Sequence, residues 1–233
     1  MIDDPSALPA LLAEREPPHD CPLCPRLAAY RAELRVAHPD WYNAPVPMFG
    51  DPDAWLAIVG LSPGMKGGNR TGRVFTGEKA GVLLFQTLLA MVLAEGEYGG
   101  RADDGLMLDG VAVIDAVRCV PPNNQPTREE ARTCRPFLSG PLAALPELRV
   151  VVALGEDAHR SAVKALGGKL PKARFAHLAE HRFPSGVRLI DSWHPADLDA
   201  GAPRLSPDMF EAVIARALVL RAASEREAAA VAP

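Results

Sequence analysis

The chain has 233 residues, of which 48% are hydrophobic, and its formal net charge at neutral pH is −4. This length suits one domain with a sizeable core. No apolar run approaches the roughly 18 residues that span a bilayer, and the N-terminus lacks the basic and apolar regions of a signal peptide. The composition therefore argues against a membrane-spanning protein, and we expect a monomer in the cytoplasm.

The charge distribution is more informative than the net charge, which does not by itself indicate a nucleic-acid partner. Acidic residues concentrate in residues 1–20. We expect this segment and the tail 225–233 to be weakly ordered, on either side of a single domain over residues 21–224. Two stretches, 64–79 and 160–182, are locally basic. Each is either an ordinary solvated face or a contact for phosphates.

Four apolar runs rich in β-branched residues alternate with helical patterns. The runs are nearly continuous, which predicts buried parallel strands rather than strands with one solvent face. They are "WLAIVGL" (55–61), "GVAVIDAVRC" (110–119), "LRVVVALG" (148–155) and "GVRLIDSWHP" (186–195). The helical patterns cover 78–96, 127–145, 156–168 and 206–223. This alternation predicts an α/β fold, a three-layer α/β/α sandwich with a four-stranded parallel sheet.

Unusual segments lie at the C-terminal ends of all four predicted strands. They are the glycine-rich stretch after the first strand, "DAVRC" in the second, "GEDAH" after the third and "WHPAD" after the fourth. In an open α/β sheet, ligands bind at the carboxyl ends of the strands. We therefore expect the functional site at this edge.

The stretch "GLSPGMKGGNRTGRVFTG", residues 60–77, contains an excess of glycine with three basic residues and one phenylalanine. Each glycine adds backbone entropy to the unfolded chain, which lowers the stability of the fold. An excess of glycines therefore does not serve stability. Their presence indicates that another group approaches this backbone too closely to permit side chains.

Four cysteines form two pairs, a C-x2-C pair at Cys21 and Cys24 and a wider pair at Cys119 and Cys134. In a cytoplasmic chain, this pattern favours metal ligands over disulfides, although free buried thiols are an alternative. Four thiolates suit either Zn²⁺ or a [4Fe–4S] cluster, and spacing alone does not separate the two.

Together, "CPLC", the glycine-rich stretch, "AVRCVPPNNQPT", Cys134 and "WHPAD" resemble the iron–sulfur uracil-DNA glycosylases, most closely family 5, over about residues 19–215. The resemblance implies a bacterial or archaeal enzyme with a structural [4Fe–4S] cluster on Cys21, Cys24, Cys119 and Cys134. It also implies a monofunctional glycosylase that flips uracil out of DNA and excises it, leaving an abasic site in base excision repair.

The resemblance assigns further roles to residues of this chain. The base-binding pocket is expected to use Gly60, Leu61, Ser62, Gly64, Phe75, Asp115 and His194. Phosphate contacts are expected from Lys66, Asn69, Arg70 and Arg73. Phe75 would stack on the base, with a core anchor as the alternative. His194 would stabilise the departing base anion, with an ordinary loop histidine as the alternative.

Two positions depart from related enzymes. Leu61 stands where family 4 has a glutamate, so no general base is expected there. Asp115 stands where an asparagine is common. An ionised aspartate only accepts hydrogen bonds, so we expect it to point to the sugar, hold water and stabilise positive charge. The alternatives are a protonated Asp115 that donates like an amide, or an Asp115 that pairs with Arg118 or caps a loop.

Two functions follow from these observations. The first is a DNA glycosylase acting on uracil and on other deaminated bases, such as hypoxanthine and xanthine, because Leu61 leaves a more apolar pocket. The second is a metal-bound nucleic-acid-binding module without catalysis, which the missing carboxylate at Leu61 and the negative net charge leave open.

Overall fold

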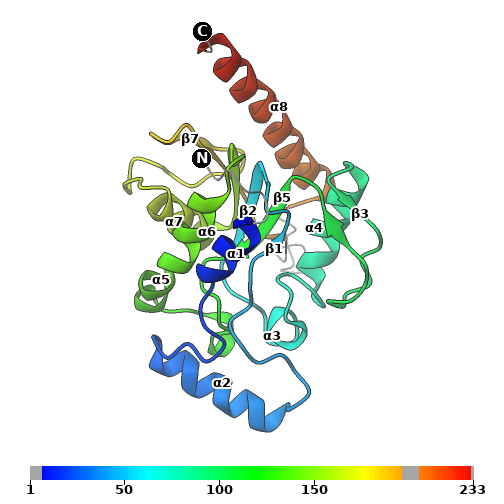
Figure 1. The fold of residues 1–233 in the computed structure, drawn as a ribbon, viewed down its shortest axis with the longest axis vertical. Helices are drawn as coiled ribbons and strands as arrows, with labels where there is room; N and C mark the ends of the chain where they lie inside the picture. The colour runs from blue at the N-terminus through cyan, green and yellow to red at the C-terminus, as the bar shows by residue number, and fades with distance from the viewer. Residues whose placement is uncertain (1–6, 196–204, 232–233) are drawn as a thin grey trace.

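A computed structural model describes residues 7–195 and 205–231 of the chain, and Figure 1 shows their arrangement. The strands are β1 (Phe49–Gly50), β2 (Leu56–Gly60), β3 (Ala94–Glu95), β4 (Met107–Leu108), β5 (Val111–Asp115), β6 (Val150–Leu154), β7 (Glu180–Arg182) and β8 (Arg188–Ser192). The helices are α1 (Ala7–Glu14), α2 (Pro25–Ala37), α3 (Gly68–Thr71), α4 (Lys79–Ala90), the short 3₁₀ turn η1 (Pro122–Asn124), α5 (Arg128–Cys134), α6 (Pro136–Ala144), α7 (Glu156–Ala165) and α8 (Pro207–Val231).

The main sheet has six strands in the order β1-β5-β2-β6-β8-β7. Its four central strands are parallel and correspond to the four predicted apolar runs. All residues of β2, β5 and β6 are buried, which explains why these strands read as continuous apolar segments. The short strands β1 and β7 add antiparallel edges that the sequence analysis did not predict.

Helices cover both faces of the sheet, which confirms the three-layer α/β/α prediction. Successive side chains of a strand point to opposite faces. Ile58 of β2 packs in the core cluster that also holds side chains of α4 and α8. Its neighbour Val59 packs in the cluster formed with α1, α6 and α7. In Figure 1, α2 and α3 lie beyond one end of the sheet, and the C-terminal part of α8 extends past the other end.

Several predicted elements differ in detail from the structure. The helical pattern over 127–145 forms two helices, α5 and α6, which meet at Arg135 and Pro136. Thr127 and Glu130 form a capping box at the start of α5. Among the described residues, no helix is both long enough and apolar enough to cross a membrane.

Part of the segment 1–20, which we expected to be weakly ordered, forms regular structure in the described residues. Residues Ala7–Glu14 form α1, and Leu12 packs in the core cluster with α6 and α7. Glu16 pairs with the completely buried Arg118, which fixes the segment after α1. At the other end of the chain, α8 continues to Val231, so the predicted boundary at residue 224 does not coincide with a helix end.

Candidate active site

The carboxyl ends of the four parallel strands bring together residues that are far apart in the sequence. Gly60, the last residue of β2, pairs in register with Asp115, the last residue of β5. Gly155 follows β6, and a β-carbon added to it would lie 3.6 Å from Cβ of His194, which follows β8. The predicted site residues Gly60, Asp115 and His194 therefore share one edge of the sheet.

Phe75 completes this group. Its ring is 6.1 Å from the His194 ring between centroids, with an angle of 31° between the ring planes. A β-carbon on Gly60 would lie 2.7 Å from the Phe75 ring and would also collide with Oδ1 of Asp115. Glycine at position 60 therefore lets both side chains enter the site.

Phe75 is itself only 4% exposed and has a left-handed backbone with φ of 55°. Non-glycine residues rarely adopt this conformation, and it is found at functional sites that the surrounding structure enforces. The Tyr98 hydroxyl donates to the Phe75 carbonyl and helps to hold this turn. The Phe75 side chain both joins the core cluster under α4 and borders the site.

The glycine-rich loop is packed by the protein itself. The Glu78 carboxylate lies against the backbone of Gly64, and a β-carbon on Gly67 would lie 2.7 Å from this carboxylate. Gly72 has a φ of +80°, and its backbone lies against the Tyr42 ring. The close approach that the sequence indicated is therefore made by neighbouring protein groups, so contact with DNA is not required to explain these glycines.

Glu78 is a site residue that the sequence analysis missed. Its side chain is half-buried, and desolvation raises the pKa of its carboxyl to about 7. The available signal was its place directly after the glycine-rich stretch, at the N-cap of α4. Because its pKa lies near neutrality, this carboxyl exchanges a proton in the range where enzymes use general acids and bases.

Asp115 has an unusual environment. Burial is the main cause that raises the pKa of its carboxyl to about 8; the negative charge of nearby Glu78 acts in the same direction, and Arg118 acts against both. Oδ1 of Asp115 has no hydrogen-bond partner among the described residues, and Arg118 pairs with Glu16 instead. Near neutral pH, these surroundings favour the protonated Asp115, the second of the two states considered from the sequence, over the ionised form that we expected.

Two of the four expected phosphate ligands are structural. The side chain of Asn69 is buried and donates to Oδ1 of Asn43 at 2.9 Å. Arg73 is buried, makes a two-pronged ion pair with Asp104 and lies 4.9 Å from the centre of the Phe49 ring. Both side chains are buried and bound to other protein groups, so the prediction that they contact DNA phosphates is wrong.

Replacing Arg73 with glutamine is expected to lower the free energy of unfolding by about 3–5 kcal/mol, because it leaves the Asp104 carboxylate buried without its cation. Chemical denaturation measures this change. The matched control is Arg101→Gln, which breaks an exposed ion pair with Asp103 and should change stability by less than about 1 kcal/mol. Equal small effects in both variants would contradict a structural role for Arg73.

The other two expected ligands, Lys66 and Arg70, are exposed on the loop. Nε of Arg70 donates to the Lys66 carbonyl at 2.8 Å, and its guanidinium also lies beside the backbone of Gly77. Leu61 and Ser62 directly follow β2 at the same edge of the sheet, and both are half-buried.

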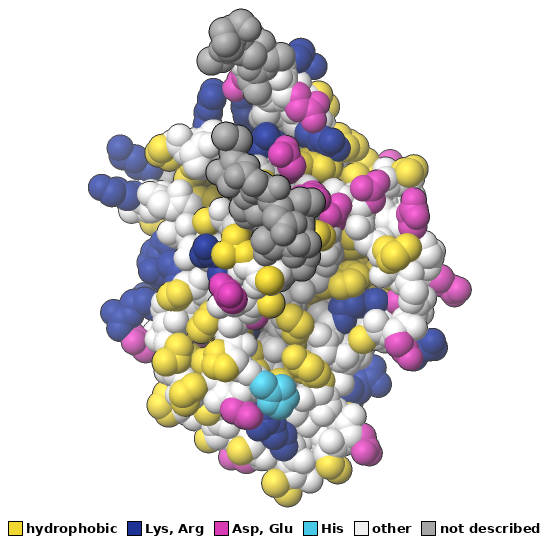
Figure 2. Space-filling model, in the orientation of Figure 1, with side chains coloured by type: hydrophobic (Ala, Val, Ile, Leu, Met, Phe, Trp, Pro, Cys, Tyr) yellow, Lys and Arg dark blue, Asp and Glu magenta, His cyan; other side chains and the backbone are white. Residues whose placement is uncertain are grey.

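A groove of about 570 Å³ adjoins this site and is lined by Leu61 together with residues of α5 and α7. Its basic lining residues are Arg128, Arg135, Arg160 and Lys164. Figure 2 shows lysine and arginine side chains gathered along the edge of the molecule where Figure 1 draws α5 and α7. The second basic stretch of the sequence thus contributes to a positive surface next to the site, which suits a polyanion.

The two cysteine pairs converge although about 95 residues separate Cys24 from Cys119 in the sequence. Cys21, Cys24, Cys119 and Cys134 line one apolar cavity beneath α2, together with side chains such as Leu27. A guanidinium nitrogen of Arg31 donates to Sγ of Cys119 at 3.5 Å.

The segment that follows His194 and Pro195, residues 196–204, lies outside the described residues. Within the described residues, the candidate site comprises Gly60, Leu61, Phe75, Glu78, Asp115 and His194.

Comparison with known proteins agrees with this arrangement. The sequence model of the Uracil DNA glycosylase superfamily matches residues 47–218, which include every residue of this site. The chain is 41% identical to a type-5 uracil-DNA glycosylase of Thermus thermophilus, over 84% of the chain and 92% of that protein. It is 39% identical to a type-5 enzyme of Pyrobaculum aerophilum, over 85% of the chain and 88% of that protein.

Similarity to the type-4 branch is weaker. A type-4 uracil-DNA glycosylase of Thermotoga maritima is 30% identical over 64% of the chain and 68% of that protein. The family model covers most of the chain, and the type-5 relatives match over nearly their whole length. The chain therefore belongs to the uracil-DNA glycosylase superfamily, in the branch formed by the type-5 enzymes.

Proposed function

We propose that this protein is a monofunctional uracil-DNA glycosylase, which acts as a cytoplasmic monomer and leaves an abasic site in DNA for base excision repair. The observation that carries this proposal is the convergence of Gly60, Phe75, Asp115 and His194 at one sheet edge, next to a basic groove. The names of the type-5 relatives support the same activity.

Hydrolysis of an N-glycosidic bond separates negative charge on the base from positive charge on the sugar. In the proposed mechanism, a flipped base enters beside Phe75, whose flat ring offers a stacking surface. His194 donates a hydrogen bond to a base carbonyl and stabilises the departing anion. Protonated Asp115 donates a second hydrogen bond, and ionised Glu78 orients the water that adds to the sugar.

We further propose that hypoxanthine and xanthine are substrates. Leu61 gives the pocket an apolar side chain at the place where a polar group would read one particular base. A pocket with few polar contacts discriminates weakly between bases, because a wrong base leaves few protein groups unpaired.

We further propose that the four cysteines hold a [4Fe–4S] cluster rather than a single zinc ion. All four line one apolar cavity, and four thiolates are the usual ligand set of such a cluster. Arg31 beside Cys119 would balance the negative charge of such a cluster. When bound, the cluster would tie α2 to the segments after β5 and around α5.

The experiment that tests the proposed function uses duplexes with one uracil, hypoxanthine or xanthine, followed by alkali and separation of the strands. Strand breaks at the uracil support the glycosylase. Binding to the duplex without breaks would contradict it and would favour a non-catalytic binding module. Breaks at uracil alone would restrict the substrate range.

If the protein holds a [4Fe–4S] cluster, the purified wild type should be brown. Replacing Cys119 with serine is expected to abolish this colour and to reduce the yield of folded protein, because metal binding is coupled to folding. Burial raises the pKa of the Cys119 thiol to about 11, so cluster loading releases protons and should weaken in acid. Iron and sulfide analysis with visible absorbance measures the effect. A colourless wild-type protein with one bound zinc would contradict the cluster.

The double variant Lys66→Gln, Arg70→Gln should bind all DNA sequences more weakly. The plot of log affinity against log salt concentration should become less steep, by about one unit of slope per lost contact. Binding titrations at several salt concentrations measure this slope. Arg149→Gln, before β6 at the opposite end of the sheet, is the control and should leave it unchanged. An unaltered slope in the double variant would assign both residues to an ordinary solvated surface.

A further inference from the structure

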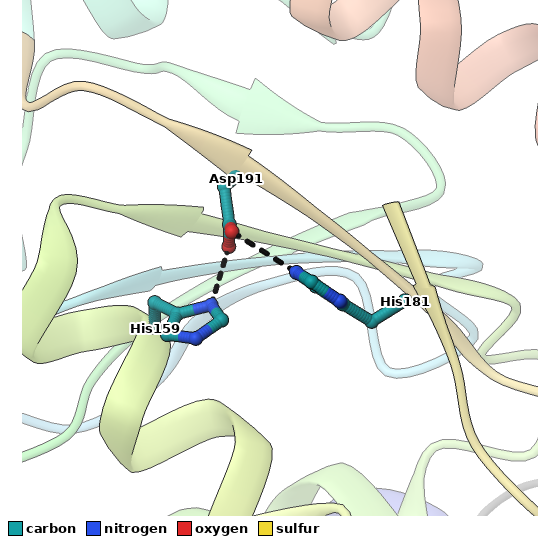
Figure 3. A group of neighbouring side chains, drawn as sticks. All are labelled: His159, His181 and Asp191. Carbon is teal, nitrogen blue, oxygen red and sulfur yellow. Dashed lines mark hydrogen bonds and ion pairs between the residues drawn. The ribbon is translucent and has the colours of Figure 1, made fainter. Parts of the chain in front are cut away.

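Two histidines and one aspartate form a cluster that the proposed reaction does not use. His159 comes from α7, His181 from β7 and Asp191 from β8, and Figure 3 shows their side chains pointing toward one another. Nδ1 of His159 lies 2.7 Å from Oδ1 of Asp191, and Nε2 of His181 lies 3.2 Å from Oδ2. His159 and Asp191 are buried, whereas the His181 side chain is 15% exposed.

The ion pairs of Asp191 decide which positive charges can compensate its carboxylate. Among the described residues, its ion pairs are with His159 and His181, and no lysine or arginine contacts it. A completely buried carboxylate is strongly unfavourable unless a positive charge compensates it. The compensation is either a proton, held on a histidine or on the carboxyl itself, or a metal ion bound among the three side chains.

The hydrogen bonds of His159 show how a metal ion would fit. Its Nε2 faces the Ala173 carbonyl at 3.1 Å. A carbonyl only accepts, so Nε2 carries a proton. In neutral imidazole, Nδ1 then holds the lone pair and faces the Asp191 oxygen, so two acceptors meet and need a cation between them. A histidine whose remote N–H is held by a backbone carbonyl is the usual arrangement of a metal ligand.

We propose that His159, His181 and Asp191 bind a divalent transition-metal ion of the zinc type, separate from the cysteine cavity. Two imidazole nitrogens and one carboxylate oxygen suit Zn²⁺, whereas Ca²⁺ and Mg²⁺ prefer oxygen ligands throughout. One donor atom from each residue lies within 4.8 Å of the others, so small side-chain rotations bring all three to bond lengths of about 2.0–2.2 Å. The exposed rim at His181 gives the ion an entry path and a place for a water ligand.

Such an ion would connect three elements at one side of the sheet. The strand β7 is a short antiparallel edge, and it pairs with β8, which leads directly to Trp193 and His194. By joining β7 and β8 to α7, the bound ion would stabilise the strand from which His194 extends. The role proposed here is structural.

The test uses the full-length protein with its cysteine site loaded, titrated with Co²⁺ and in parallel with Zn²⁺. We expect one equivalent of Co²⁺ with weak visible bands and without the intense near-ultraviolet bands of cobalt–thiolate bonds. His181→Gln should weaken binding by at least about 100-fold, since even loss of an outer partner costs 10- to 100-fold. Zn²⁺ should raise the melting temperature of the wild type but not of this variant.

His177→Gln is the matched control, because His177 is a neighbouring histidine that stacks on Trp193 and lies outside the proposed ligand set. It should retain metal binding. His181 is substituted because it is the most exposed ligand, so the fold tolerates its loss. The proposal is overturned if the wild type binds neither ion outside the cysteine site, if bound cobalt shows only thiolate bands, or if His181→Gln binds as tightly as the wild type.

Discussion

Replacing His194 with alanine is expected to slow uracil release about 100- to 1000-fold under single-turnover conditions, the usual effect of removing one donor to a developing anion. The structure places this imidazole at the carboxyl edge of the sheet, 6.1 Å from the Phe75 ring and beside Gly155. Duplex binding should change little, because the loss acts on charge that develops only during bond cleavage.

The measurement compares single-turnover excision with equilibrium binding to the same uracil-containing duplex. His38→Ala, at the end of α2, is a control histidine outside the site and should leave both quantities unchanged. An unaltered excision rate in the His194 variant would reduce this residue to an ordinary loop histidine. Loss of binding in parallel with loss of rate would instead indicate a role in holding the DNA.

The core of the fold was predictable because its signals are local. Continuous β-branched runs gave the four parallel strands, and their alternation with helical patterns gave the layers. The edge strands β1 and β7 have two and three residues, too short for any periodicity to appear. The order of residues 7–20 depends on a contact between Glu16 and Arg118, about 100 residues away, which no local pattern records.

Local signals in the sequence also predicted part of the site, but only at some positions. Gly60, Asp115 and His194 follow strands, so topology alone brings them to one edge. Arg73 and Asn69 were misassigned because a basic or polar residue in a glycine-rich loop looks available for phosphate. Their partners, Asp104 and Asn43, are 31 and 26 residues away and become visible only in the fold.

Glu78 and Asp115 make the clearest case of chemistry set by tertiary structure. Burial raises both pKa values, to about 7 for Glu78 and about 8 for Asp115, and the negative charge of Glu78 contributes to the second shift. Glu78 therefore loses its proton first. Between the two values, the site holds one carboxylate that orients water and one carboxylic acid that donates a hydrogen bond, so two similar groups take different roles.

This assignment predicts a bell-shaped dependence of single-turnover uracil release on pH. The rate should rise through about pH 7 as Glu78 ionises and fall through about pH 8 as Asp115 loses its proton. Glu78→Gln should lower the rate by about 100-fold or more and should remove the rising limb. Asp115→Asn should keep most of the activity at neutral pH and should remove the falling limb, because an amide donates at every pH.

The stability of the same variants provides an independent control. The ordinary pKa values are 4.5 for Glu78 and 3.8 for Asp115, and both are raised in the folded protein. The folded protein therefore holds these protons more tightly than the unfolded chain, so the two groups stabilise the fold in acid. That stabilisation is lost as pH rises from about 4 through 7 and 8. The unfolding free energy of the wild type should therefore fall over this range, and that of Asp115→Asn should fall less. A large loss of uracil release in Asp115→Asn at neutral pH, with Glu78→Gln still active, would reverse the two roles and make Asp115 the working carboxylate.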